Sequence, residues 1–211
     1  MPLDAVLLDL DGTVLDSHGL ILSSWRHVCE TYDLSGDDEA FRVGIGRPLE
    51  DILAPFCRSP EEVVSVIAAY RAHNDIHHDA AIKAFPDMAE AILELRAAGV
   101  RVAIVTSKSR PFAERGLRIA CIEVDALVVP KDVARPKPAA DPVLHALELV
   151  GARAARAIMV GDAPSDLQAG RAAGVATGAA LWGPFSREEL APFAPDHWLA
   201  SPADLLQLAL G

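Results

Sequence analysis

Two aspartates directly follow the first apolar run of the chain. Asp9 and Asp11 come after residues 5–8 (Ala-Val-Leu-Leu), and Gly12 comes next. Alternate residues of an extended segment point to the same face, so these two carboxylates are expected side by side. Such a pair needs a cation between the carboxylates, a proton on one of them, or both. The spacing alone leaves a structural role open, because aspartates also begin helices and turns after strands.

Three further groups of polar residues lie beyond apolar runs later in the chain. Residues 106–108 (Thr-Ser-Lys) follow one such run, and Asp162 and Asp166 follow another. Lys137 lies between two prolines, which restrict the backbone and so orient its side chain. Each group by itself has an ordinary interpretation, as a helix cap or an exposed loop residue. In an open parallel sheet, however, ligands bind beyond the carboxyl ends of the strands, so the four groups together indicate one site.

The residue types at these four places favour one kind of chemistry. Four carboxylates without an accompanying His or Cys pattern suit a hard cation, and Mg²⁺ held by a few carboxylates, water and a substrate phosphate fits them best. Hydroxyl groups and a lysine can then hold the oxygens of a phosphoryl group and offset its charge. The sequence therefore predicts a Mg²⁺-dependent site for phosphoryl transfer that acts on a small phosphorylated metabolite.

The four segments, DLDGTVLDS, VTSK, RPKP and GDAPSD in this order, resemble the four motifs of the haloacid dehalogenase superfamily. The resemblance covers essentially the whole chain and is greatest to the phosphoglycolate phosphatase-like branch, which carries a helical cap between the first and second motifs. It implies an α/β fold with a doubly wound, mostly parallel, Rossmann-like sheet and an inserted helical cap domain. Each motif is weak singly, but the ordered set is specific.

The resemblance assigns a catalytic role to four matching residues. Asp9 would be the nucleophile that takes the phosphoryl group, and Asp11 would be the general acid and then the general base. Thr106 would bind a phosphate oxygen, and Lys137 would neutralise charge on the nucleophile and the phosphate. These roles agree with the chemistry, because a carboxylate attacks a phosphate dianion only where positive charge offsets the repulsion. The second carboxylate argues for phosphoryl transfer over carbon–halogen cleavage, since the family's dehalogenases lack it.

The same resemblance implies the ligands of the metal ion. Mg²⁺ would be held by Asp9, the backbone carbonyl of Asp11, Asp162 and Asp166, the last of these directly or through water. All of these ligand atoms are oxygens, which Mg²⁺ prefers in proteins. We therefore expect Mg²⁺ as the cofactor.

Three further residues are expected to contact the substrate. Thr13 and Ser107 lie within the first two motifs. Residues 44–49 (Gly-Ile-Gly-Arg-Pro-Leu) resemble the family's substrate-facing cap loop, so Arg47 is placed to bind a carboxylate or a second anionic group. An exposed arginine in a turn before a helix is an equally good interpretation of Arg47.

The alternation of strands and helices is interrupted after the first motif. From about residue 16 to about residue 83 helical spacing dominates, and Ser59 and Pro60 begin one of these helices. We therefore expect a Rossmann-like catalytic core of residues 1–15 and 84–211 and a helical cap domain of residues 16–83. The core elements predicted after the second motif are strands at 124–129, 157–160, 176–182 and 197–199 and helices at 112–119, 142–150, 167–173 and 203–210.

Composition and charge narrow the function further. The chain has 211 residues, 51% of them hydrophobic, which is enough to bury a sizeable core. A formal net charge of −11 disfavours nucleic acid as a partner, and no apolar run is long enough to span a bilayer, so no membrane role is expected. Cys29, Cys57 and Cys121 are far apart and follow no metal-binding spacing. We expect reduced thiols in a cytoplasmic protein, with a monomer and a homodimer both open.

Three histidines of the predicted cap invite a metal interpretation. His73 and His77 share a helical face, and His78 is adjacent. No glutamate lies between them as in the zinc protease pattern, so ordinary helix positions are the favoured interpretation.

The hypothesis that follows is a phosphoric monoester hydrolase that works through an aspartyl-phosphate intermediate. The resemblance favours 2-phosphoglycolate as substrate, and pyrophosphate, a sugar phosphate or a nucleotide monophosphate stay as alternatives. A phospho-receiver module also uses clustered carboxylates, a hydroxyl and a lysine, but it has no need of a cap insert. A non-catalytic binding protein on the same fold is a further alternative, although every catalytic position carries the expected residue type.

Overall fold

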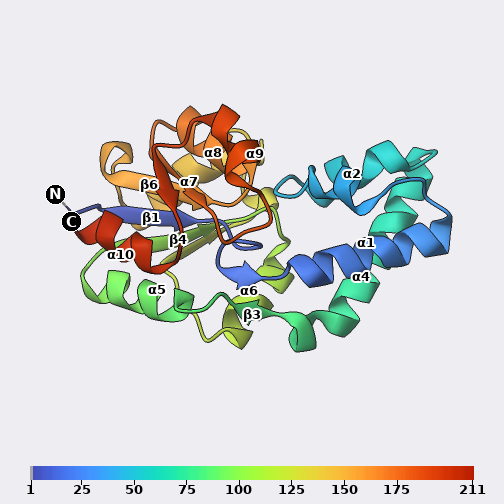
Figure 1. The fold of residues 1–211 in the computed structure, drawn as a ribbon, viewed down its shortest axis with the longest axis horizontal. Helices are drawn as coiled ribbons and strands as arrows, with labels where there is room; N and C mark the ends of the chain where they lie inside the picture. Colours follow the sequence, from blue (N-terminus) through green and yellow to red (C-terminus); the bar gives the residue numbers. More distant parts are fainter. Residues whose placement is uncertain (1) are drawn as a thin grey trace.

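Six parallel strands form the centre of the structure, a computed structural model that describes residues 2–211 (Figure 1). The strands are β1 (Ala5–Leu8), β4 (Arg101–Val105), β5 (Ala126–Val128), β6 (Ala157–Gly161), β7 (Ala176–Ala180) and β8 (His197–Leu199). Their order in the sheet is β5-β4-β1-β6-β7-β8. The first strand is therefore central, with Ala5 opposite both Arg101 and Ala157.

Helices cover both faces of this sheet. All four residues of β1 are buried, with Val6 and Leu8 in one hydrophobic cluster and Ala5 and Leu7 in the other. A strand covered on both faces has a continuous run of apolar residues, which is why β1 could be predicted from the sequence. The first cluster includes α5 (Met88–Ala97), α6 (Arg110–Ile119) and α10 (Ala203–Leu210), and the second includes α7 (Asp141–Val150) and α8 (Pro164–Ala172). The predicted doubly wound α/β fold is confirmed.

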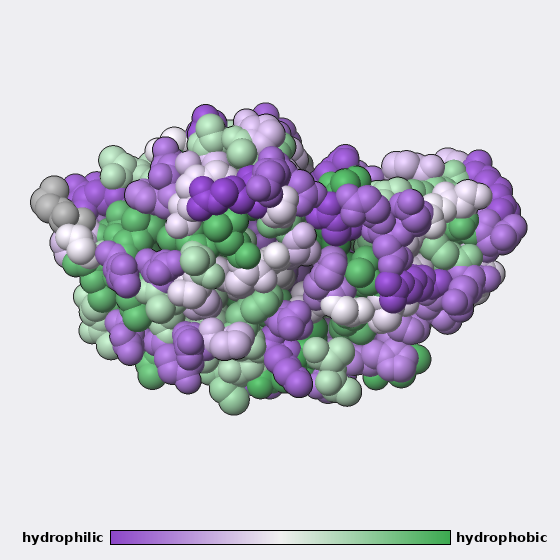
Figure 2. Space-filling view, viewed as in Figure 1, coloured by the Kyte–Doolittle hydropathy of each residue, from purple (hydrophilic) through white to green (hydrophobic). Residues whose placement is uncertain are grey.

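A helical insertion, defined here as residues 18–81, extends from one end of the sheet (Figure 1). Its helices are α1 (His18–Tyr32), α2 (Asp38–Arg42), α3 (Leu49–Leu53) and α4 (Pro60–Ala81). At its base two short strands, β2 (Leu15–Asp16) and β3 (Lys83–Ala84), pair antiparallel. Figure 2 shows the insertion as a lobe, with a notch along the upper edge where it meets the rest of the molecule. The domain limits expected from the sequence stay a prediction.

The longest helix of the insertion begins where the sequence predicts a helix start. Ser59 Oγ accepts the backbone N–H of Glu62 at 3.2 Å, and Pro60 occupies the first helical position, where no N–H is needed. The insertion also belongs to a hydrophobic cluster that it shares with Leu167 of α8 and Phe185, and in this cluster Trp25 stacks on Phe41 with ring centroids 4.7 Å apart. Apolar packing therefore joins the insertion to the rest of the molecule.

Polar contacts join the insertion to the rest of the molecule. Ser107 Oγ, beyond the end of β4, donates to the backbone carbonyl of Gly46 at 2.7 Å. Arg42, at the end of α2, pairs with Glu189 of the short helix α9 (Arg187–Leu190). The insertion is therefore held against the loops that follow the strands.

His78 is a buried titratable residue at the contact between α4 and α6. Its side chain is fully buried, its ring centroid lies 5.5 Å from that of Phe112, and its Nε2 has no hydrogen-bond partner within residues 2–211. Burial lowers the pKa of His78 below its ordinary value of 6.5, and this effect outweighs the hydrogen bond to Asp79. Below pH 6.5, the ordinary pKa, His78 binds a proton more readily in the unfolded chain than in the folded one. Its contribution therefore lowers the free energy of unfolding as the pH falls.

When the pH is lowered from about 7 to about 5, the free energy of unfolding of His78→Phe is expected to fall less than that of the wild type. Phenylalanine fills a similar volume beside Phe112 but does not titrate. Urea unfolding of both proteins at several pH values measures the difference. The same loss of stability in both proteins would contradict a role for His78 in the pH dependence.

The predicted strands and helices around the sheet are confirmed to within a few residues. The structure adds β2, β3 and α9, which have too few residues to give a periodic signal. Within residues 2–211, none of the helices combines the length and the apolar composition that crossing a bilayer requires.

Candidate active site

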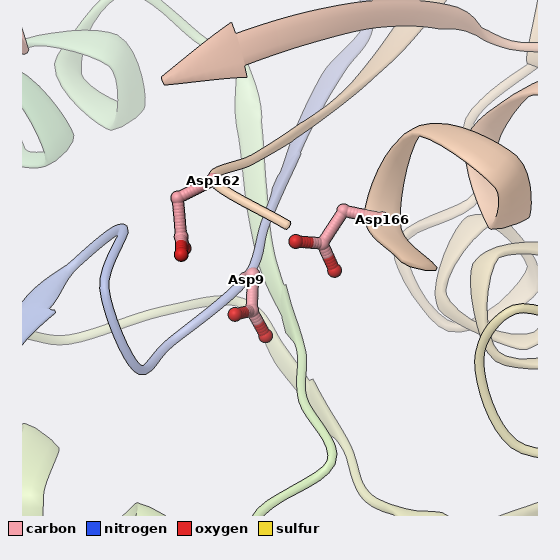
Figure 3. Close-up of side chains that lie close together, drawn as sticks. All are labelled: Asp9, Asp162 and Asp166. Carbon is pink, nitrogen blue, oxygen red and sulfur yellow. The ribbon is translucent and has the colours of Figure 1, made fainter. Parts of the chain in front are cut away.

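Three acidic side chains converge beyond the carboxyl ends of two neighbouring strands (Figure 3). Asp9 directly follows β1, Asp162 directly follows β6, and Asp166 lies in the first turn of α8. One carboxylate oxygen of each residue lies within 4.8 Å of those of the other two, and all three side chains are buried. The parallel pairing of β1 with β6 brings together two segments that are far apart in the sequence.

Local contacts fix the loops that carry these carboxylates. Gly12 has a φ of +89°, and a Cβ atom at this position would lie 2.6 Å from Asp162 Oδ2, so only glycine fits. Thr13 Oγ1 donates to Asp162 Oδ1 at 2.6 Å. Asp166 Oδ2 accepts the backbone N–H of Ala163 at 3.0 Å, which caps the start of α8.

Lys137 places one positive charge among the three carboxylates. Its Nζ donates to Asp9 Oδ1 and to Asp166 Oδ1, both at 2.6 Å, and its side chain is 1% exposed. Burial opposes this charge, but the carboxylates of Asp166 and Asp9 outweigh burial and raise the pKa of the ammonium above its ordinary value. Lys137 therefore stays charged and connects the nucleophile candidate to α8.

The cluster carries more negative than positive charge. Three carboxylates against one ammonium leave two surplus negative charges when every group is ionised. Burial, followed by repulsion from Asp9 and Asp166, raises the pKa of Asp162 well above its ordinary value. Burial also raises the pKa of Asp9 to about 7, against the lowering effect of Lys137. Added positive charge would stabilise this arrangement.

A divalent cation fits the cluster. Asp162 Oδ2 is buried and has no hydrogen-bond partner within residues 2–211, so an acceptor is left free among the three carboxylates. Hard oxygen ligands and two surplus negative charges match Mg²⁺. Asp9, Asp162 and Asp166 would hold the ion, with the backbone carbonyl of Asp11 as the further ligand that the sequence predicts. In the part of the chain that the structure describes, no other three His, Cys, Asp or Glu side chains come so close together.

The Asp11 side chain contacts a residue to which the sequence assigns no role. Lys108 Nζ donates to Asp11 Oδ1 at 2.8 Å and to Oδ2 at 3.0 Å, and Ser17 Oγ donates to Oδ1 at 2.6 Å. The pair is mostly buried, with side-chain exposures of 10% for Lys108 and 17% for Asp11. Lys108 lies two residues after Thr106 in the second motif, and this place is the one sign in the sequence that it belongs to the site. The direction of its side chain could not be predicted, because strand periodicity does not extend beyond the end of the strand.

A cavity of about 500 Å³ lies between the sheet and the helical insertion. Five residues predicted to act on the substrate line it: Asp9, Asp11, Arg47, Thr106 and Ser107. The insertion supplies much of the apolar wall through Ile21, Phe41, Ile45, Leu49, Ile52 and Tyr70. A cavity of this size, apolar with a few polar groups at one place, is typical of a small-molecule site.

Two residues expected to bind substrate have other contacts in the structure. Thr13 is fully buried behind Asp162, donates its hydroxyl to that carboxylate, and is absent from the cavity lining. Ser107 lines the cavity, but its hydroxyl donates to Gly46 of the insertion. Substrate binding by Thr13 and Ser107 stays a prediction, and the contacts seen here are positioning contacts.

The comparisons with known proteins agree with this site. A family model described as "Haloacid dehalogenase-like hydrolase" matches residues 6–180. The "Pyrophosphatase PpaX" of Halalkalibacterium halodurans is 35% identical over 212 residues, covering 99% of this chain and 97% of that protein. The "Putative pyrophosphatase PpaX" of Clostridium perfringens is 34% identical over 207 residues, covering 97% of this chain and 96% of that protein.

Solved structures have the same fold. The crystal structure of a "putative phosphoglycolate phosphatase" from Lactobacillus plantarum is similar with a TM-score of 0.86 and 26% identity, covering 99% of this chain and 100% of that one. A "Putative haloacid dehalogenase-like hydrolase" from Bacteroides fragilis has a TM-score of 0.88 at 24% identity, covering 96% of this chain and 99% of that one. Since the family model covers most of the chain and the curated relatives nearly all of it, the chain belongs to the haloacid dehalogenase-like hydrolases, as a phosphatase with an inserted helical cap.

Proposed function

We propose that this protein is a Mg²⁺-dependent phosphatase that cleaves inorganic pyrophosphate through an aspartyl-phosphate intermediate at Asp9. The observation that carries the proposal is the cluster of Asp9, Asp162 and Asp166, two of which accept hydrogen bonds from Lys137, next to a cavity of small-molecule size. The curated relatives are named pyrophosphatases. They favour pyrophosphate over 2-phosphoglycolate, the substrate that the sequence resemblance favours.

Asp9 has one carboxylate oxygen available for attack. Oδ1 accepts a hydrogen bond from Lys137, whereas Oδ2 accepts none within residues 2–211, and the side chain lines the cavity. Oδ2 can therefore form a bond to phosphorus while the bond from phosphorus to the leaving oxygen breaks. Lys137 favours the ionised, attacking form of Asp9 against the effect of burial, and offsets part of the repulsion from the phosphate.

Thr106 is placed to hold the phosphate. Its Oγ1 accepts the backbone N–H of Lys108 at 3.1 Å, which leaves the hydroxyl hydrogen free to donate to a phosphate oxygen. Lys108 and Arg47 line the same cavity and add positive charge there. These groups bind and orient the substrate so that phosphorus lies within reach of Asp9.

Asp11 lines the cavity and is our candidate for moving the proton. In the first step its protonated form gives a proton to the leaving oxygen. In the second step the resulting carboxylate takes a proton from water as the water oxygen bonds to phosphorus and the bond between Asp9 and phosphorus breaks, which restores the protonated form. Ser17 and Lys108 hold its carboxylate in place. When bound, Mg²⁺ supplies two positive charges that reduce the repulsion between Asp9 and the phosphate.

A panel of phosphate compounds tests this function. Pyrophosphate, 2-phosphoglycolate, a sugar phosphate and a nucleoside monophosphate are assayed for phosphate release with Mg²⁺ and then with excess EDTA. We expect the highest kcat/KM with pyrophosphate, a loss of turnover in EDTA, and recovery when Mg²⁺ is restored. Unchanged turnover in EDTA would contradict the metal dependence, and a higher kcat/KM for another compound would displace pyrophosphate.

The second candidate substrate is 2-phosphoglycolate. The Lactobacillus plantarum structure, which is 26% identical over nearly the whole chain, bears the name of a phosphoglycolate phosphatase. Arg47 in the cavity lining suits the carboxylate of that substrate. The ratio of the two kcat/KM values in the same panel decides between the candidates.

Two further expectations belong to this proposal. We assign catalysis to residues 1–15 and 84–211 and control of access to the cap of residues 16–83, because the insertion forms one wall of the cavity. We also propose a cytoplasmic location, which the three free cysteine thiols support.

A further inference from the structure

The cavity gathers positive side chains that have no partner. Within residues 2–211, most arginines and lysines contact a carboxylate, a backbone carbonyl or an aromatic ring. The exceptions are Arg47, Arg71, Lys83, Arg118 and Lys131. Three of these five, Arg47, Arg71 and Lys131, line the cavity. In a chain with a formal net charge of −11, this concentration of free cations at one cavity indicates an anionic ligand.

The three cations come from both walls of the cavity. Arg47 and Arg71 both belong to the insertion: Arg47 lies in the loop between α2 and α3, and Arg71 lies in α4, next to Tyr70. Lys131 comes from the opposite wall, in the 3₁₀ turn Pro130–Asp132 that follows β5. A ligand that contacts all of them would therefore bridge the insertion and the sheet.

The carboxylates of the lining do not neutralise these cations. Asp132, the neighbour of Lys131, accepts the backbone N–H of Val129 at 2.9 Å and a guanidinium N–H of Arg110 at 2.7 Å. Asp11 and Asp9 are likewise paired, with Lys108 and Lys137. Glu50 is the one lining carboxylate without a cationic partner in the part of the chain that the structure describes, so positive charge is left over.

We propose that Arg71 and Lys131, together with Arg47, form a subsite for a second anionic group, so that the preferred substrates are phosphate esters or anhydrides whose leaving group is itself an anion. The proposal rests on the phosphatase function above. The phosphoryl group to be transferred binds at Asp9 and Thr106, and the leaving group binds the cations. The departing phosphate of pyrophosphate and the carboxylate of a small phospho acid both fit this class, whereas a neutral alcohol does not.

Charge-removing variants test the subsite on two substrates. Arg71→Met and Lys131→Met keep the apolar stems of the side chains. Phenyl phosphate is the comparison substrate because it carries no anionic group besides the phosphate that is transferred. For pyrophosphate we expect KM to rise roughly tenfold in each variant, and for phenyl phosphate we expect less than about a twofold change. Arg118→Met is the matched control, since Arg118 is an exposed free cation outside the cavity and its loss is expected to change neither KM.

A binding measurement removes the dependence on turnover. Methylenediphosphonate, which cannot be hydrolysed, is titrated into each protein by calorimetry. We expect weaker binding by Arg71→Met and Lys131→Met, wild-type binding by Arg118→Met, and recovery in Lys131→Arg, which keeps the charge. Unchanged binding in both Met variants would overturn the subsite.

The kinetic outcomes separate this inference from the proposed function. If the wild type hydrolyses phenyl phosphate and pyrophosphate, and the Met variants change both KM values equally or neither, the subsite is wrong and the phosphatase function stands. If no phosphate compound is hydrolysed, the proposed function is wrong, and methylenediphosphonate binding alone decides whether the cations form an anion subsite.

Discussion

The Asp9→Asn variant is expected to release phosphate at least about 10⁴-fold more slowly than the wild type. A neutral amide cannot take the place of the carboxylate oxygen that attacks phosphorus. The change keeps the size of the side chain, and an amide oxygen can still accept the hydrogen bond that Lys137 gives to Oδ1. Initial rates of phosphate release with saturating Mg²⁺ measure the effect, and rapid acid quenching tests for phosphorylated protein.

Asp16→Asn is the matched control for this variant. Asp16 belongs to the same motif but is exposed and absent from the cavity lining, so its substitution is expected to leave the rate within about twofold of wild type. Both variants are expected to show the circular dichroism of the wild type. A wild-type rate from Asp9→Asn, or phosphorylated protein trapped from it, would show that another group is the nucleophile.

The Lys137→Met variant is expected to lose both turnover and stability. In EDTA the free energy of unfolding should fall by about 3–5 kcal/mol, because removing one partner of a buried ion pair leaves carboxylates of Asp9 and Asp166 without compensation. Added Mg²⁺ should recover part of this loss, since an ion that binds only the folded chain stabilises it. Urea unfolding with EDTA and with Mg²⁺ measures both effects.

Asp162→Asn is expected to shift stability in the opposite direction. Repulsion from Asp9 and Asp166 adds to the cost of burying the Asp162 carboxylate, so removing that charge should raise the free energy of unfolding in EDTA. The same variant should gain less stability from Mg²⁺ than the wild type does. If Asp162→Asn and Lys137→Met lowered stability alike in EDTA, packing rather than charge would govern this cluster.

The position of the acidic cluster could be predicted from the sequence because it depends on strand ends. The runs at residues 5–8 and 157–160 are apolar without interruption, since each strand is buried on both faces. The residues after them must then emerge at one end of a parallel sheet. The positions of Asp9 and Asp162 follow from that rule alone. The position of Asp166 follows from its place in the first turn of the next helix.

Side-chain pairings could not be predicted in the same way. The contact between Lys108 and Asp11 joins two loops, and their course beyond the strands depends on turns rather than on periodicity. Thr13 follows Gly12 in the turn after β1, and its hydroxyl donates a hydrogen bond to Asp162 instead of pointing into the cavity. Arg71 illustrates the same limit, because the pattern of α4 shows which face is buried but not which exposed residue lines the cavity.

The central place of β1 has a consequence for synthesis of the protein on the ribosome. β1 is translated well before both of its neighbours in the sheet, β4 and β6, which come much later in the chain. Until then the nascent polypeptide carries an apolar segment with two open edges, which is a hazard for aggregation. Pairings between such distant segments also form slowly, because closing long loops costs entropy. Asp9 is translated long before Lys137, Asp162 and Asp166, so the cluster can assemble only when translation has passed Asp166.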